Sequence, residues 1–92
     1  MAIMLLHFEV DDYDAWKPGF DEDPAGRAES GATSHKSARS VDNPNEVFIR
    51  LEFPSADQAK AFRERLLESG VLERITVKGG PEVVELADEA EY

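Results

Sequence analysis

Apolar and polar residues alternate with a period of two along several stretches of the chain. In each of the segments Ile3–Val10 and Glu46–Phe53, at least one of the two alternating sets of residues is entirely apolar. This pattern is typical of β-strands, because side chains point alternately to the two faces of a strand. A more polar alternation over Thr33–Arg39 precedes the turn residues Asn43–Asn45 and predicts a hairpin strand. The short apolar run Glu82–Ala87 is the last predicted strand.

The first stretch with helical spacing follows the first predicted strand. Tyr13, Trp16 and Phe20 recur at i, i+3 and i+7, so they would share one face of a helix. Asp11 or Asp12 stands where an N-cap is expected.

This first helical element is predicted to be long and broken. Pro18 lies inside the pattern, and because proline removes a helical hydrogen bond we expect a kink there. Asp23–Pro24 predicts a second helical start, with a cap followed by proline at the first helical position. Gly31 would end this second part.

The second helix follows the third predicted strand. Ser55 and Gln58 form a capping box, and Gly70 is placed to end the helix. Residues Val71–Lys78 fit either a short helix or a frayed strand, and Gly79–Pro81 predicts a break before the last strand. The apolar residues that keep helical spacing are Ala59, Phe62, Leu66 and Leu67.

The element order is therefore β-α-β-β-α-β over one predicted domain, residues 1–92. This order predicts an α+β, ferredoxin-like fold, with a four-stranded antiparallel sheet and two helices on one face. The face expected under the helices carries Met4, Leu6, Phe8, Val47, Ile49, Leu51 and Phe53. The opposite face, called the open face below, carries Ile3, Leu5, His7, Glu9, Phe48, Arg50, Glu52 and either Val83 or Val84.

Several large apolar groups on the open face predict that it is a contact surface. Two open faces paired about a twofold axis would bury these groups and enclose the polar ones. We therefore expect a homodimer, a dimeric α/β barrel, with a half-polar cavity that accepts a small hydrophobic ligand.

Composition narrows the choice of partners and location. Twenty acidic and ten basic residues give a formal net charge of −10, which repels nucleic-acid phosphates and anionic lipid. We expect neither a nucleic-acid nor a membrane partner, and the absence of cysteine excludes disulfides and thiolate sites. The chain opens on a strand pattern and not on a signal sequence, so a cytoplasmic location is expected. The dispersed acidic surface fits either a halophilic protein or an ordinary acidic one.

Two histidines are the candidate catalytic residues. His7, on the open face, could shuttle a proton near neutral pH, or it could simply be an interface residue. His35, on the polar strand, would either line the cavity or face the solvent. Together with Glu9 they could in principle ligate a metal ion, but no tight spacing motif supports this, so no metal and no cofactor are predicted.

The candidate ligand-binding residues are aromatic or charged. Arg50 and Glu52 share the open face with Phe48 and could hold an anionic or hydroxylated ligand, although an ion pair between the two charged residues is the competing interpretation. Trp16 could stack on a ligand, or pack in the core between the first helix and the sheet.

Three segments resemble the dimeric α/β-barrel superfamily, in particular the small cyclase-like and antibiotic-biosynthesis-monooxygenase-like (ABM-like) proteins. They are DYDAWKPGFDE, DNPNEV and GGPEVVEL, and the likeness extends over nearly the whole chain. The resemblance implies homodimers whose sheets face each other around a cavity. Similar proteins often carry a histidine where this chain has Asp23. Haem-degrading members use a tryptophan on a later helix, whereas Trp16 lies on the first, so that activity is not expected.

The function predicted from the resemblance is cofactor-independent oxygenation or cyclisation of a small aromatic or polyketide-like compound. The alternative is a non-catalytic module that binds small molecules or is associated with stress. The absence of a recognisable catalytic constellation favours this alternative, whereas the half-polar cavity is compatible with both.

Overall fold

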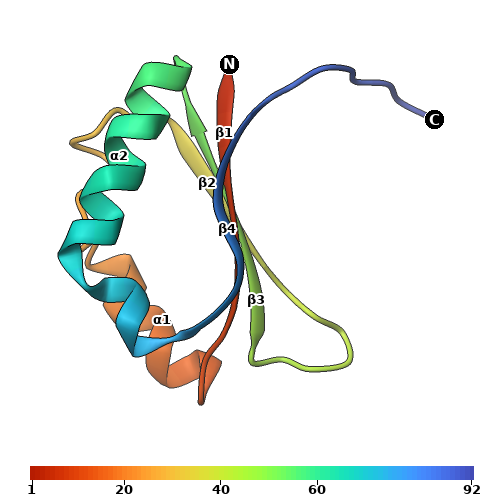
Figure 1. The fold of residues 1–92 in the computed structure, drawn as a ribbon. Coiled ribbons are helices and arrows are strands. Elements are labelled where there is room, and N and C mark those ends of the chain that lie inside the picture. The colour runs from red at the N-terminus through yellow and green to blue at the C-terminus, as the bar shows by residue number, and fades with distance from the viewer.

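The computed structural model describes residues 1–92 and shows four antiparallel strands with both helices on one side of the sheet (Figure 1). The strand order is β2-β3-β1-β4. This architecture confirms the predicted ferredoxin-like βαββαβ fold. Along the chain the elements are β1 (Ala2–Glu9), α1 (Tyr13–Asp21), β2 (Ser34–Arg39), β3 (Glu46–Phe53), α2 (Ala56–Ser69), the 3₁₀ turn η1 (Val71–Arg74) and β4 (Thr76–Glu85).

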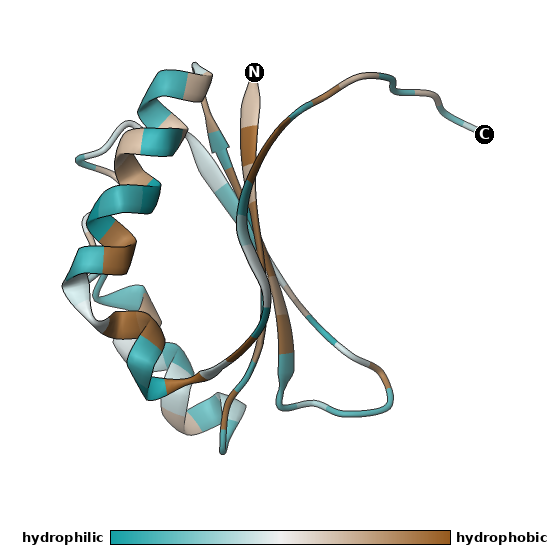
Figure 2. Cartoon of the chain, in the orientation of Figure 1, coloured by the Kyte–Doolittle hydropathy of each residue, from teal (hydrophilic) through white to brown (hydrophobic).

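The core lies between the sheet and the helices, where Figure 2 shows the apolar positions of α2 turned toward the strands. Strands β1 and β3 pair without a register shift, from Ala2 opposite Phe53 to Glu9 opposite Glu46. The period of two therefore sends matching residues of both strands to the same face. All seven residues predicted for the helix-side face are buried. On α2, Leu66 is buried whereas Leu67 is 53% exposed, because consecutive helical residues point about 100° apart.

Helix α1 begins as predicted, with the Asp12 carboxylate accepting a hydrogen bond from the Asp14 backbone N–H. Pro18 lies inside the helix, which ends at Asp21. The predicted second helical start at Asp23–Pro24 is wrong, since residues 22–31 form turns. Ala25, Ala28 and Ala32 keep helical spacing, but the backbone turns into the left-handed region at Asp23, Gly26 and Gly31, which interrupts any helical path.

The predicted break at Gly79–Pro81 is also wrong. Strand β4 runs through these residues, and its pairing with β1 shifts register between Leu5 and Phe8. A bulge with glycine accommodates such a shift, and proline is tolerated because β4 is an edge strand.

The open face points away from both helices, on the side where the β2–β3 loop and the C-terminal segment project (Figure 1). Leu5 and Phe48 are each 42% exposed there, whereas Ile3 is buried. Val84 pairs with Ile3 and Val83 with Met4, so Val84 belongs to the open face. No helix in the chain is long and apolar enough to cross a membrane.

Candidate functional site

A hollow of about 220 Å³, called the helix-side cavity below, lies between the sheet and the two helices. Leu6 and Ile49 line it from the sheet, Phe62 and Leu66 from α2. The cavity predicted by the sequence was placed on the other face, between two copies of the chain. A hollow on the helix side was not foreseen.

Large aromatic side chains hold α1 away from the rest of the fold. No Cα atom of α1 lies within 8 Å of a Cα atom in another helix or strand. Trp16 fills part of the gap, with its ring 5.2 Å from the Phe8 ring and 4.9 Å from the Phe20 ring between centroids. Trp16 and Phe20 stay only partly buried and form one wall of the cavity.

Three charged residues, Glu22, Arg27 and Arg74, also line the cavity. Arg27 is the most enclosed, with a side chain only 14% exposed. Its guanidinium lies over the Phe20 ring, 3.8 Å from the centroid, which is a favourable cation–π geometry. Burial lowers the pKa of Arg27, and the carboxylates of Asp23 and Asp21 oppose this shift. A guanidinium nevertheless stays protonated at neutral pH.

Asp23 holds the turn from which Arg27 projects. Its backbone is left-handed, with φ 57°, and its carboxylate accepts hydrogen bonds from the backbone N–H groups of Arg27 (2.6 Å) and Ala28 (3.1 Å). The Arg27 Nε lies 3.5 Å from the same carboxylate. Burial alone would raise the pKa of Asp23, but these hydrogen bonds and the charges of Arg27 and Arg65 together lower it.

We expect Asp23→Asn to reduce the free energy of unfolding at pH 7 by about 1–2 kcal/mol, as for the loss of a helix cap. Because the folded state lowers the pKa of Asp23 below 3.8, its stabilisation is complete above the unfolded-state pKa. It is lost as the pH falls through the folded-state pKa. Urea denaturation from pH 7 to 2.5 should therefore show the variant and the wild type converging in acid. Asp42→Asn, on an exposed loop, is the control, and an equal deficit at every pH would contradict the assignment.

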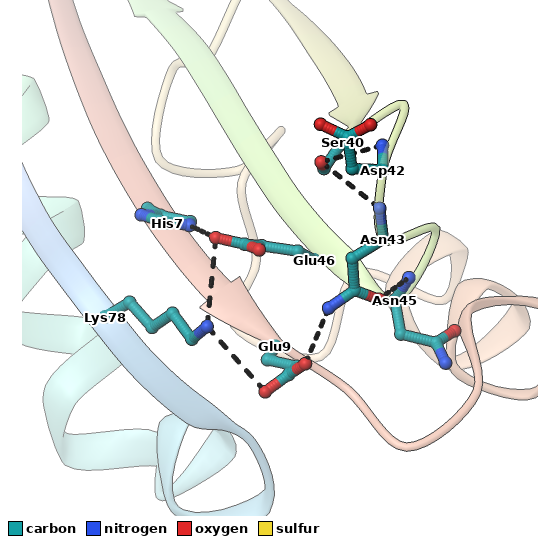
Figure 3. Close-up of polar contacts among 8 residues, drawn as sticks. All are labelled: His7, Glu9, Ser40, Asp42, Asn43, Asn45, Glu46 and Lys78. Atoms are coloured by element: carbon teal, nitrogen blue, oxygen red, sulfur yellow. Dashed lines mark hydrogen bonds and ion pairs between the residues drawn. The ribbon is translucent and has the colours of Figure 1, made fainter.

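The open face carries a separate group of interacting polar side chains, the His7 cluster, formed by His7, Glu9, Asn43, Glu46 and Lys78 (Figure 3). Glu9 and Glu46 stand directly opposite each other on β1 and β3, an arrangement that is destabilising for like charges. Their neighbours compensate for it. Lys78 Nζ lies 3.8 Å from a carboxylate oxygen of each, His7 Nε2 lies 2.6 Å from Glu46, and Asn43 donates a 2.8 Å hydrogen bond to Glu9.

The other predicted residues of the open face lie beside this cluster. The His7 ring stacks on Phe48, 4.1 Å between centroids and 14° between planes. Arg50 Nη2 lies 3.4 Å from Glu52 Oε1, which is the ion pair that the sequence left as an alternative. The buried Arg50 Nε has no hydrogen-bond partner.

The six predicted site residues do not form one site. His7, Phe48, Arg50 and Glu52 share the open face, whereas His35 and Trp16 lie on the helix side. His35 stands opposite Leu51 in the β2–β3 register, and its exposed ring meets the Phe20 ring edge-on at 5.3 Å. His7 and Arg50 therefore lie on the opposite face of the sheet from His35, and the two histidines cannot share a metal ion.

Sequence reasoning missed Arg27 and Arg74 at the helix-side cavity. Arg27 lies in the segment that was interpreted as a helix, where its side chain had no predicted direction. Arg74 lies in the stretch for which helix and strand both remained open. Neither belongs to a recognisable motif, so no pattern in the sequence distinguished these two arginines from the rest.

The chain shares its ferredoxin-like α/β fold with solved structures. It is similar over 99% of its length to the structure of Rv0793 from Mycobacterium tuberculosis, with full coverage of that chain, a TM-score of 0.64 and 18% identity. It is also similar to a protein from Chloroflexus aurantiacus J-10-fl whose name assigns it to the antibiotic biosynthesis monooxygenases. Here the TM-score is 0.60 and the identity 12%, with 99% of this chain and 95% of the other covered. No protein-family model and no curated protein matches the sequence. At these identities the likeness establishes the fold.

Proposed function

We propose that this protein binds a small, planar aromatic compound in the helix-side cavity. The observation that carries the proposal is an unfilled hollow of about 220 Å³, walled by Trp16 and Phe20 and lying over an apolar sheet. Ligand sites typically combine such an apolar lining with a few polar groups. A flat ring system would stack against the aromatic wall, and the volume suits a compound of two or three fused rings.

The catalytic form of this proposal is oxygenation without a cofactor. An activated CH₂ group of the substrate would lose a proton and give up electrons to O₂, so that CH₂ and O₂ become C=O and water. Glu22 is the one carboxylate that lines the cavity and is the candidate base. The fold shared with a protein named as a monooxygenase favours catalysis. The absence of histidine from the cavity lining favours the alternative, which is binding without turnover. Oxygen uptake with anthrone, a three-ring ketone with an acidic CH₂ group, distinguishes the two.

The binding proposal is tested by filling the cavity from Gly19. This residue lines the cavity, and a Cβ added to it would meet no atom within 4 Å. Gly19→Leu should therefore fold normally and weaken the binding of naphthalene-1-methanol, a neutral two-ring probe, by roughly 10-fold or more, as expected when a side chain occupies the ligand's volume. Calorimetric titration gives the affinities.

The matched control is Ala61→Leu, which adds a leucine to an exposed position of α2 outside the cavity lining. It should leave the affinity unchanged. If both variants bind the probe as the wild type does, the compound occupies another place and the helix-side cavity is not the site.

We also propose that two copies associate through their open faces. Leu5 and Phe48 are large, apolar and exposed there, and a second copy would cover them and the His7 cluster. In such a dimer His7, Arg50 and Glu52 would face the partner's sheet.

Phe48→Asp should shift the wild-type dimer toward monomer, because the new carboxylate would be buried without a partner. Sedimentation equilibrium should give about twice the 10.2 kDa chain mass for the wild type and a value closer to one chain for the variant. Leu67→Asp, at an exposed position of α2, is the control. A wild-type protein that is monomeric at high concentration would remove the dimer proposal and leave the cavity proposal intact.

A further inference from the structure

The guanidinium of Arg27 is enclosed, yet it donates no hydrogen bond to the protein. Its side chain is 14% exposed, and its one ion pair is with the Asp23 carboxylate, 3.5 Å from Nε. A guanidinium has five N–H donors, and none of those of Arg27 is fully buried without a partner, so its free donors remain accessible to a ligand. The face of the group is occupied by Phe20, so the remaining donors lie at its edge.

Arg27 also lies where two hollows meet. It lines the helix-side cavity and a neighbouring polar hollow of about 210 Å³, to which Thr33, Ser34 and His35 contribute. Phe20 connects the two regions, because its ring contacts Arg27 on its face and His35 at its edge. A ligand with its rings in the apolar cavity would thus place a substituent at the Arg27 fork.

We propose that Arg27 makes this a site for aromatic carboxylates, with the ring system in the helix-side cavity and the carboxylate paired to the guanidinium edge. The planar fork of arginine matches the two oxygens of a carboxylate. Arg74, which forms no ion pair, lines the same cavity and adds a second positive charge. Asp23 is a positioning residue, because it pairs with Nε and fixes the turn. This inference rests on the proposed function and specifies its ligand class.

The negative charges of the protein oppose the binding of an anion at this site. The chain carries a formal net charge of −10, so its general field repels an organic anion. Glu22 also lines the cavity, but it is exposed, so solvent and salt screen its charge. A preference for an anion in this acidic protein would have to come from local contacts and not from the net charge.

The test compares 1-naphthoate with naphthalene-1-methanol, two probes with the same rings and a charged or neutral substituent. By calorimetric titration at pH 7, the wild type should bind 1-naphthoate roughly 10- to 100-fold more tightly, the range expected for a charge-assisted, bidentate pair. Arg27→Gln should abolish this preference, so that its affinities for the two probes agree within about twofold. Arg27→Lys should retain part of the preference, because it keeps the charge without the fork.

Lys60→Gln is the matched control, since it removes one positive charge from an exposed position outside both hollows. It should leave both affinities unchanged, and circular dichroism should show that Arg27→Gln keeps the fold of the wild type. Equal affinity of the wild type for both probes, or a carboxylate preference that survives Arg27→Gln, would overturn the inference and leave the proposed function standing. Failure of both probes to bind would instead overturn the proposed function.

Discussion

Phe53→Ala is expected to reduce the free energy of unfolding by about 3–5 kcal/mol, the usual cost of removing a fully buried phenylalanine. Phe53 has no exposed surface and packs against Phe62 with 5.6 Å between ring centroids. It does not line the helix-side cavity, so the hole it leaves is new and surrounded by packed atoms. In a domain of this length, whose total stability is about 5–14 kcal/mol, the melting temperature should fall by roughly 15–30 °C.

Thermal and urea unfolding followed by circular dichroism measure this effect. Phe53→Leu should cost less, because leucine fills most of the volume. Leu67→Ala serves as the surface control, since Leu67 is 53% exposed and its loss should cost less than about 1 kcal/mol. A Phe53→Ala protein that melts with the Leu67→Ala protein would mean that the end of β3 is not part of the core.

The sheet and its two faces could be predicted from the sequence because alternation is a local property. In β3 the apolar set Val47, Ile49, Leu51 and Phe53 is uninterrupted, so the buried face follows from the period of two alone. The caps at Asp12 and Ser55 were equally legible, since each accepts a backbone hydrogen bond within its own first turn.

The two wrong secondary-structure predictions lie at segments that contain proline, where local sequence preferences alone predicted a turn or a helix start. Gly79–Pro81 has the composition of a turn, yet the pairing of β4 with β1 carries the strand through it. Asp23–Pro24 has the composition of a helix start, yet only small alanines follow at helical spacing and the chain turns at Gly26 and Gly31. In both places the outcome depends on contacts with residues distant in sequence, Leu5 in the first case and Arg65 and Gln58 packed beside the glycines of the turn in the second.

The candidate site could not be predicted because its residues come from elements with no common period. Trp16 was correctly placed on a helix that faces the sheet. The distance of α1 from the sheet, however, depends on the combined size of the Phe8, Trp16 and Phe20 rings. The position of Arg27 depends on a turn held by Asp23. His35 was assigned to the correct strand, but the alternation of β2 is polar on both faces, so the sequence offered no criterion for choosing between them.

Gly80→Ala is expected to reduce the free energy of unfolding by about 2–4 kcal/mol, combining the cost of a left-handed alanine with a steric overlap. Gly80 has φ 83°, and a Cβ added there would lie 2.3 Å from the Leu5 carbonyl oxygen. The obstacle is backbone, so β4 would have to move away from β1 at the bulge. Hydrogen exchange should show β4 amides losing protection before those of β3.

Gly79→Ala is the matched control one residue earlier in the same strand. Its Cβ would meet no heavy atom closer than the His7 Cβ at 3.7 Å, an ordinary contact, and the Gly79 backbone is not left-handed. This substitution should change the unfolding free energy by less than about 0.5 kcal/mol, or stabilise slightly by restricting the unfolded chain. Because the two variants add the same methyl group to adjacent residues, their difference isolates the close approach of Gly80 to Leu5. Equal effects of the two substitutions on stability would mean that the backbone at the bulge rearranges at little cost in free energy. The bulge would then not fix the register of β4.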